Sequence, residues 1–120
     1  ELFPSNNFQA ITLNELLLTQ QKFDLIYCAE VIEHVPEPHE FMASLNALMG
    51  KGSVLYLTTP DAGHRKVPKD FVSWNRVTPP EHIGYFNRKT MTKLLSENGF
   101  DGIKFFWSHR ANMRVICKKI

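Results

Sequence analysis

Residues 23–35, which read Phe-Asp-Leu-Ile-Tyr-Cys-Ala-Glu-Val-Ile-Glu-His-Val, decide the fold of this chain. The apolar run ends at Cys28, an acidic turn with a histidine follows directly, and Pro36 and Pro38 come next. Such a run predicts a strand over 23–28 that is buried on both faces of a parallel sheet. In open α/β sheets, ligands bind just beyond the carboxyl ends of such strands. The turn after Cys28 is therefore where we expect the chemistry.

Length and composition limit the class of protein. The 120 residues make one domain at most, and a hydrophobic content of 43% with 22% charged residues excludes a disordered chain. A net charge of +2 argues against nucleic acid as a partner, and no stretch is long enough to span a membrane. We expect Cys28 and Cys117 to be buried thiols, which suits a cytoplasmic protein. A disulfide bond between these two cysteines is the alternative. A chain that begins at Glu1 suggests a piece of a longer protein.

The segments around this strand show, in turn, the hydrophobic patterns of strands and of helices. A short strand is predicted over 8–13, followed by one helical turn. Apolar residues at i, i+4, i+7 and i+8 predict an amphipathic helix over 38–49, with Gly50 just beyond its end. A second buried strand is predicted over 53–59, where Thr59-Pro60 stops it. The first half of the chain therefore has the β-α-β order of a parallel sheet.

The second half begins with a long loop. Residues 60–86 lack clear periodicity, and a loop of this length in a compact domain is usually functional. Asn87 is expected to cap a helix that ends at Gly99. Strands over 103–107 and 113–118 have a short connection, which predicts an antiparallel hairpin. The aromatic residues of the loop could line an acceptor pocket or form the loop's own core; they are Trp74, Tyr85 and Phe86.

Four further motifs accompany the opening stretch in a fixed order: Leu48–Leu55, Thr58–Asp61, His82–Phe86 and Leu94–Phe100. Together they resemble the class I S-adenosylmethionine-dependent methyltransferases, in particular the ubiquinone-biosynthesis O-methyltransferases and the type 11–23 group. The resemblance implies an α/β, three-layer, Rossmann-like sheet, of which this chain is the second half, strands four to seven. The last strand is then antiparallel and lies between the second and third strands of this chain. The family's glycine-rich cofactor turn and its ribose-binding acid are missing from the 120 residues.

The resemblance also implies which residues lie near the cofactor. Cys28, Ala29 and Glu30 match positions near the methyl-donor end of S-adenosylmethionine, and Thr12 and Leu13 match positions beside its adenine. The alternative for all five is ordinary packing in the sheet.

Glu30, Glu33 and His34 are spaced i, i+3 and i+4, so they share one face if their turn is helical. With His82 from the loop they resemble the Glu-x-x-Glu-His and distant His metal site of small-RNA 2′-O-methyltransferases. This resemblance implies a divalent ion, such as magnesium, that acidifies the attacking hydroxyl. Without an ion, His34 is the candidate general base. The alternative is that Glu33 and His34 bind backbone amides of the turn while Glu30 faces solvent.

The combined interpretation is the C-terminal part of a methyltransferase that acts on a hydroxyl of a small molecule. Two alternatives stay open: a non-catalytic scaffold that keeps the methyltransferase fold, and a fragment of another doubly wound enzyme. The identity of the acceptor and the oligomeric state stay open as well.

Overall fold

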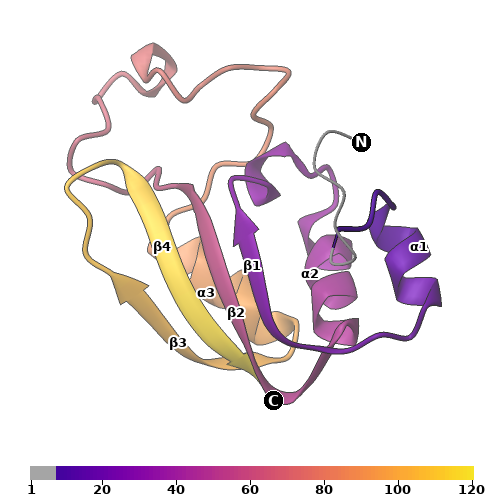
Figure 1. The fold of residues 1–120 in the computed structure, drawn as a ribbon. Helices are drawn as coiled ribbons and strands as arrows, with labels where there is room; N and C mark the ends of the chain where they lie inside the picture. The colour runs from indigo at the N-terminus through magenta and orange to yellow at the C-terminus, as the bar shows by residue number, and fades with distance from the viewer. Residues whose placement is uncertain (1–7) are drawn as a thin grey trace.

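A four-stranded mixed sheet with helices over one face forms the frame of the molecule (Figure 1). The structure is a computed structural model and describes residues 8–120. Its elements follow in the order α1 (Leu13–Leu18), β1 (Phe23–Ala29), the 3₁₀ turn η1 (Ile32–His34), α2 (Pro38–Ala47), β2 (Met49–Pro60), the 3₁₀ turn η2 (Phe71–Ser73), α3 (Arg88–Glu97), β3 (Phe100–Phe106) and β4 (Asn112–Lys119).

The strand order is β1-β2-β4-β3, with β1 parallel to β2 and β4 antiparallel to both of its neighbours. This confirms the predicted sheet order and the predicted antiparallel last strand. The helical crossover α2 lets β2 run parallel to β1, whereas the short connection between β3 and β4 forces a hairpin. As a result β1, β2 and β3 all end at the same edge of the sheet.

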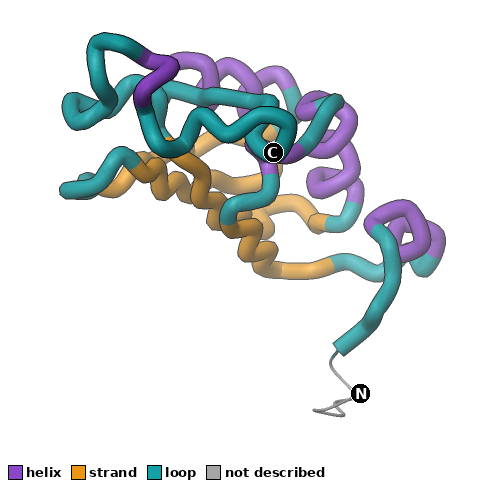
Figure 2. The backbone as a smooth tube through the Cα atoms, turned by 90° about the horizontal axis from the view of Figure 1, so that it is seen from above, coloured by secondary structure: helices purple, strands orange, loops and turns teal. Residues whose placement is uncertain are grey.

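The core lies between the sheet and the helices α2 and α3, which cover the same face (Figure 2). Apolar residues at helical spacing turn inward; they are Met42 and Leu45 of α2 with Met91, Leu94 and Leu95 of α3. The predicted ends of α3 are confirmed, whereas the helix predicted over 38–49 ends at Ala47 and Gly50 lies inside β2, because the chain pairs with β1 from Met49 onward. The Asn87 side chain accepts from the backbone N–H of Thr90, and Gly99 after α3 has a φ of +84°.

The predicted strand over 8–13 is wrong, because the chain instead enters a helix at Leu13. The Thr12 side chain accepts from the backbone N–H of Glu15 at 3.1 Å, and the Glu15 carboxylate accepts from the backbone N–H of Thr12 at 2.7 Å. This reciprocal cap fixes the start of α1. A Thr-x-x-Glu pattern therefore outweighs the apolar character of the preceding residues.

The expectation that β1 is buried on both faces is also wrong. Cys28 is 7% exposed, but Leu25 and Tyr27 on the opposite face are 62% and 67% exposed. Tyr27 stacks on Tyr56 with ring centroids 5.3 Å apart. The described helices α2 and α3 cover only one side of the sheet, so residues 8–120 build two of the three layers that the resemblance implied (Figure 2).

Cys28 and Cys117 are free and buried, which confirms the prediction of two buried thiols. Among the described residues, no helix is long and apolar enough to cross a membrane.

Candidate functional site

The candidate site lies at the carboxyl ends of β1 and β2, where η1 follows β1 and the loop after β2 returns over it. The backbone N–H groups of Ile83 and Gly84 both donate to the carbonyl of Glu33, at 2.9 and 3.0 Å. At the base of the same loop, the N–H of Ala62 donates to the carbonyl of Phe86 at 2.8 Å. Backbone bonds therefore hold residues 82–84 against the turn that carries Glu33 and His34.

Glu33 is a buried carboxylate with a side chain that is only 2% exposed. The hydroxyl of Thr59 at the end of β2 donates to its Oε2 at 2.8 Å, and Thr59 is fully buried. A charge-assisted hydrogen bond of this kind offsets part of the cost of burying the carboxylate. The neighbouring strand thus fixes the position of Glu33.

His34 and His82 each use the Nδ1 atom to bind a backbone carbonyl. The Nδ1 of His34 lies 2.6 Å from the carbonyl oxygen of Glu81, and the Nδ1 of His82 lies 2.7 Å from that of Arg76. A carbonyl oxygen can only accept, so Nδ1 carries the hydrogen in both rings. In a neutral imidazole this leaves Nε2 with a free lone pair, ready to accept a proton or bind a metal ion.

The two imidazoles and Glu33 form one compact group. The ring centroids of His34 and His82 are 4.8 Å apart, and the Nε2 of His34 lies 3.8 Å from Oε1 of Glu33. Each of the three residues offers one ligand atom, and these atoms all lie within 4.8 Å of one another. The structure therefore brings together three of the four residues for which the sequence predicted a shared site.

Glu30, the fourth residue, lies outside this group. The 3₁₀ turn begins only at Ile32, and Glu30 itself has a φ of +55°, so the i, i+3, i+4 spacing does not place it on a common helical face. Its Oε2 lies 3.5 Å from the hydroxyl of Thr58. In the amide orientation that satisfies both of its polar atoms, Asn112 donates to Oε1 of Glu30 at 3.3 Å. Burial first, and then the charge of Glu33, raise the pKa of Glu30.

The residues predicted to lie near the cofactor fall in two places. Cys28 and Ala29 end β1, and burial together with the charge of Glu33 raises the pKa of the Cys28 thiol to about 11, so this thiol stays neutral. Thr12 is exposed and caps α1, while Leu13 is the first residue of that helix and packs against the core. The cofactor-binding roles of all these residues, Glu30 included, stay predictions.

Sequence reasoning did not assign a role to two residues that support the site. Thr59 was visible only as part of a Thr-Thr-Pro motif, and its hydrogen bond to Glu33 follows from the pairing of β1 with β2. Asn112 gave no signal in the sequence, because its contact with Glu30 depends on β4 lying directly beside β2. Both contacts arise from sheet topology.

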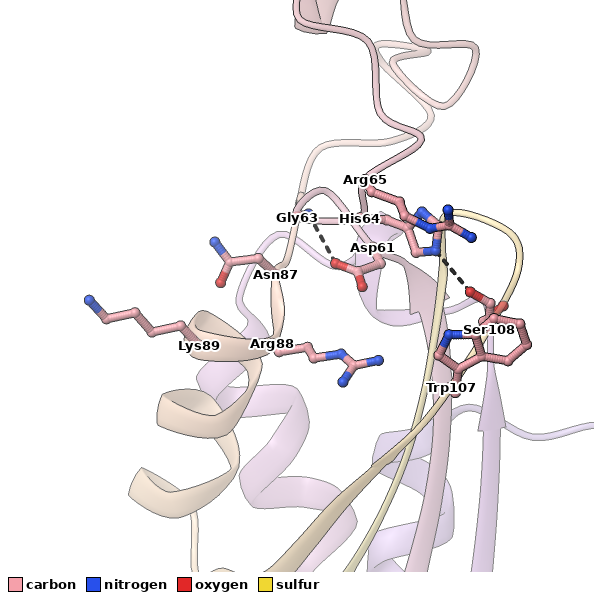
Figure 3. A pocket seen from close by; sticks show the side chains of 9 residues that line it. All are labelled: Asp61, Gly63, His64, Arg65, Asn87, Arg88, Lys89, Trp107 and Ser108. Atoms are coloured by element: carbon pink, nitrogen blue, oxygen red, sulfur yellow. Dashed lines mark hydrogen bonds between the residues drawn. The ribbon is translucent and has the colours of Figure 1, made fainter.

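A cavity of about 460 Å³ lies farther along the same edge of the sheet, between the start of α3 and the ends of β2 and β3 (Figure 3). Its wall includes the buried Asp61, whose Oδ1 accepts from the backbone N–H of Gly63 at 2.9 Å. The Nε2 of His64 donates to the carbonyl of Ser108 at 2.9 Å. Because this histidine is held by backbone groups through both nitrogens, it does not offer a free ring nitrogen.

The loop aromatics form mainly a small core of their own. The Phe71 ring lies 5.7 Å from the Trp74 ring and 5.3 Å from the Tyr85 ring, measured between centroids. Phe86 instead packs against the main core.

Comparison with known proteins gives the family. A family model described as a methyltransferase domain matches residues 2–104. The ubiquinone biosynthesis O-methyltransferase of Histophilus somni is 29% identical over 126 residues, which cover 95% of this chain and 46% of that protein. The ubiquinone biosynthesis O-methyltransferase of Glaesserella parasuis is 37% identical over 57 residues, 43% of this chain and 24% of that protein. The chain thus spans less than half the length of these relatives.

Solved structures show the same fold. An S-adenosylmethionine-dependent methyltransferase from Archaeoglobus fulgidus superposes with a TM-score of 0.69 at 15% identity, covering 91% of this chain and 66% of that one. Human N-acetylserotonin methyltransferase, solved in complex with S-adenosylmethionine, gives a TM-score of 0.65 at 17% identity and covers 80% of this chain and 29% of that one. The solved structures thus share the fold, and the family match over residues 2–104 identifies the chain as a member of the class I S-adenosylmethionine-dependent methyltransferase family.

Proposed function

We propose that the protein transfers a methyl group from S-adenosylmethionine to a hydroxyl of a small molecule, and that this chain supplies the acceptor side of the active site. Family membership and the O-methyltransferase relatives support the reaction type. The observation that carries the proposal is the free Nε2 of His34, held beside Glu33 at the carboxyl end of β1. An unprotonated imidazole at this position is suited to take a proton from a hydroxyl acceptor.

In this proposal each residue of the site has a distinct task. The bound cofactor supplies an electrophilic methyl group on a sulfonium. The Nε2 of His34 removes the proton as the acceptor oxygen attacks, and the carboxylate of Glu33, 3.8 Å away, stabilises the imidazolium that forms. The carbonyl of Glu81 holds the ring in place throughout. Cys28, Ala29 and Glu30 would lie near the methyl-donor end of the cofactor, and Thr12 and Leu13 near its adenine.

We further propose that Glu33, His34 and His82 can hold one divalent ion. The residues fit this role because one ligand atom from each lies within 4.8 Å of those of the other two, and both imidazoles use Nδ1, not Nε2, to bind the backbone. With Glu30 outside the group, the donors are two imidazoles and one carboxylate. This set suits zinc or another transition metal better than magnesium, which prefers oxygen ligands. A bound ion would lower the pKa of the acceptor hydroxyl.

These two roles of His34 exclude each other, because both use Nε2. The test is methyl transfer by the whole protein with radiolabelled S-adenosylmethionine and a panel of hydroxyl acceptors. His34→Gln should lower kcat by about 10²-fold or more in either role, whereas His39→Gln, a matched exposed histidine on α2, should not. Inactivation by a chelator, reversed by zinc, supports the ion, and turnover that resists chelation supports the free base. Unchanged activity of His34→Gln would overturn both.

The non-catalytic scaffold is not favoured, since such a protein has no need of two imidazoles with free Nε2 atoms. The two free thiols suit a reducing compartment, and we propose the cytoplasm as the place of action.

A further inference from the structure

A second cavity, of about 570 Å³, opens between the loop after β2 and the turn that joins β3 to β4. Its volume is in the range of small-molecule sites. The wall combines the buried Trp74 with the polar Asn112 and three cationic residues, Lys66, Arg76 and Arg110.

The charge of this cavity has one sign. Its lining residues include three cations and no aspartate or glutamate. Among the described residues, no carboxylate lies within 4.0 Å of the charged groups of Lys66, Arg76 or Arg110. Outside the lining, Glu30 interacts with this group, since the charge of Arg76 opposes part of the rise in the Glu30 pKa. Two arginines and a lysine in a wall that contains no acidic residue still favour an anionic ligand, for which arginine offers paired donors.

The cavity also shares its wall with the candidate site. Asn112 lines the cavity and donates to the carboxylate of Glu30 at 3.3 Å in its satisfied orientation. Arg76 also lines it, and its carbonyl accepts from the Nδ1 of His82 at 2.7 Å. A molecule bound between Arg76 and Arg110 would therefore lie beside Glu30 and His82.

We propose that this cavity binds a carboxylate or phosphate group of the methyl acceptor, which makes the acceptor class a hydroxyl compound with an anionic group. The assignment to the acceptor rests on the proposed function, whereas binding of an anion in the cavity does not. Three cations hold the anionic group, and the free hydroxyl of the same molecule extends past Asn112 toward Glu33, His34 and His82.

Two tryptophans allow a direct test, because Trp74 lines this cavity while Trp107 lines the neighbouring one beside Arg88. The full chain, labelled with ¹⁵N, is titrated with inorganic phosphate and, separately, with benzoate. The indole N–H signals are assigned with Trp107→Phe. We expect a saturable shift of the Trp74 signal with at least one of the two anions, at a Kd on the order of 1 mM, and little change of Trp107.

Variants then locate the site. Arg110→Gln and Lys66→Gln should each weaken binding about tenfold. Lys69→Gln removes a charge from the same loop without touching the cavity, so its affinity should equal that of the unchanged chain. Three results would overturn the proposal: shifts of the Trp107 signal alone, a loss of anion affinity in Lys69→Gln as large as that in Arg110→Gln and Lys66→Gln, or no saturable shift with either anion. Phosphate binding alone would identify a phosphorylated acceptor, and benzoate binding alone a carboxylate acceptor.

The link to catalysis is tested separately on the whole protein. Arg110→Gln should raise the KM for an anionic acceptor about tenfold with little change in kcat, because Arg110 holds the anionic group and is not one of the three residues placed to act on the hydroxyl. The same variant should leave unchanged the KM for an analogue of this acceptor that lacks the anionic group. An equal effect on both acceptors would overturn the assignment of the cavity to the acceptor. Absence of methyl transfer altogether would count against the proposed function and leave the anion-binding result standing.

Discussion

The hydrogen bond from Thr59 to Glu33 gives a direct test of how the site is held. Replacement of Thr59 by valine keeps the shape of the side chain but removes the hydroxyl that donates to Oε2 at 2.8 Å. Thr59 is fully buried and Glu33 is 2% exposed, so water cannot easily replace the lost donor. Hydrogen bonds to charged groups contribute about 1.5–3 kcal/mol, and we expect Thr59→Val to lower the free energy of unfolding by about 2 kcal/mol.

The matched control is Thr58→Val on the preceding residue. The Thr58 hydroxyl lies 3.5 Å from Oε2 of Glu30, a longer contact to a half-buried carboxylate, so its loss should cost less than about 1 kcal/mol. Urea unfolding at neutral pH measures both variants. In a Glu33→Gln background the effect of Thr59→Val should shrink, because the charged acceptor is gone. Equal losses at Thr58 and Thr59, or no coupling to Glu33, would refute the reasoning.

Three further predictions follow from the fold and the sequence. Burial and nearby negative charge raise the pKa of Cys28 from 9.0 to about 11. The neutral thiol therefore contributes stability that is complete below pH 9 and is lost as the pH rises toward 11, by about 3 kcal/mol. In Cys28→Ala the free energy of unfolding should fall less steeply between pH 9 and 11 than in the unchanged chain. Identical pH dependence of the two would contradict this. Gly99→Ala should lower the free energy of unfolding, measured by thermal unfolding, by about 1 kcal/mol more than Gly102→Ala does. Both glycines have a positive φ, but only at Gly99 would an added Cβ meet Asn46, at 2.9 Å. Equal effects of the two substitutions would count against the close contact. Isothermal titration of the 120-residue chain should show no micromolar affinity for S-adenosylmethionine, because the chain carries no glycine-rich turn after a strand; micromolar binding would show that the determinants lie elsewhere.

Sheet topology was the part of the fold that the sequence determined most strongly. The apolar run that ends at Cys28, the amphipathic spacing before Gly50 and the short connection after Trp107 each have only a few compatible arrangements, and the resemblance selected one sheet order. The wrong prediction over residues 8–13 came from reading apolar residues without weighing the Thr12 and Glu15 cap. Burial of β1 was misjudged because an apolar strand does not reveal whether both faces are covered by the same chain.

The candidate site was only partly accessible from the sequence. Glu33 and His34 are neighbours in the chain, and His82 follows from the loop that starts at the adjacent strand end, so their convergence could be predicted. Glu30 could not be placed, since its left-handed backbone breaks the spacing argument. The contact of Asn112 with Glu30 depends on strand register across the sheet. No local pattern encodes such a long-range pairing.

The tautomers of three histidines test the central claim most directly. Long-range ¹H–¹⁵N spectra of the neutral rings report which nitrogen carries the hydrogen. The structure predicts the Nδ1–H form for His34 and His82, because Nδ1 donates to a carbonyl in each. His64 serves as an internal control with the opposite Nε2–H form, since its Nε2 donates to the carbonyl of Ser108 while its Nδ1 accepts from the backbone N–H of Lys66. An Nε2–H form at His34 would leave no lone pair facing Glu33 and would contradict both its role as a base and its role as a metal ligand.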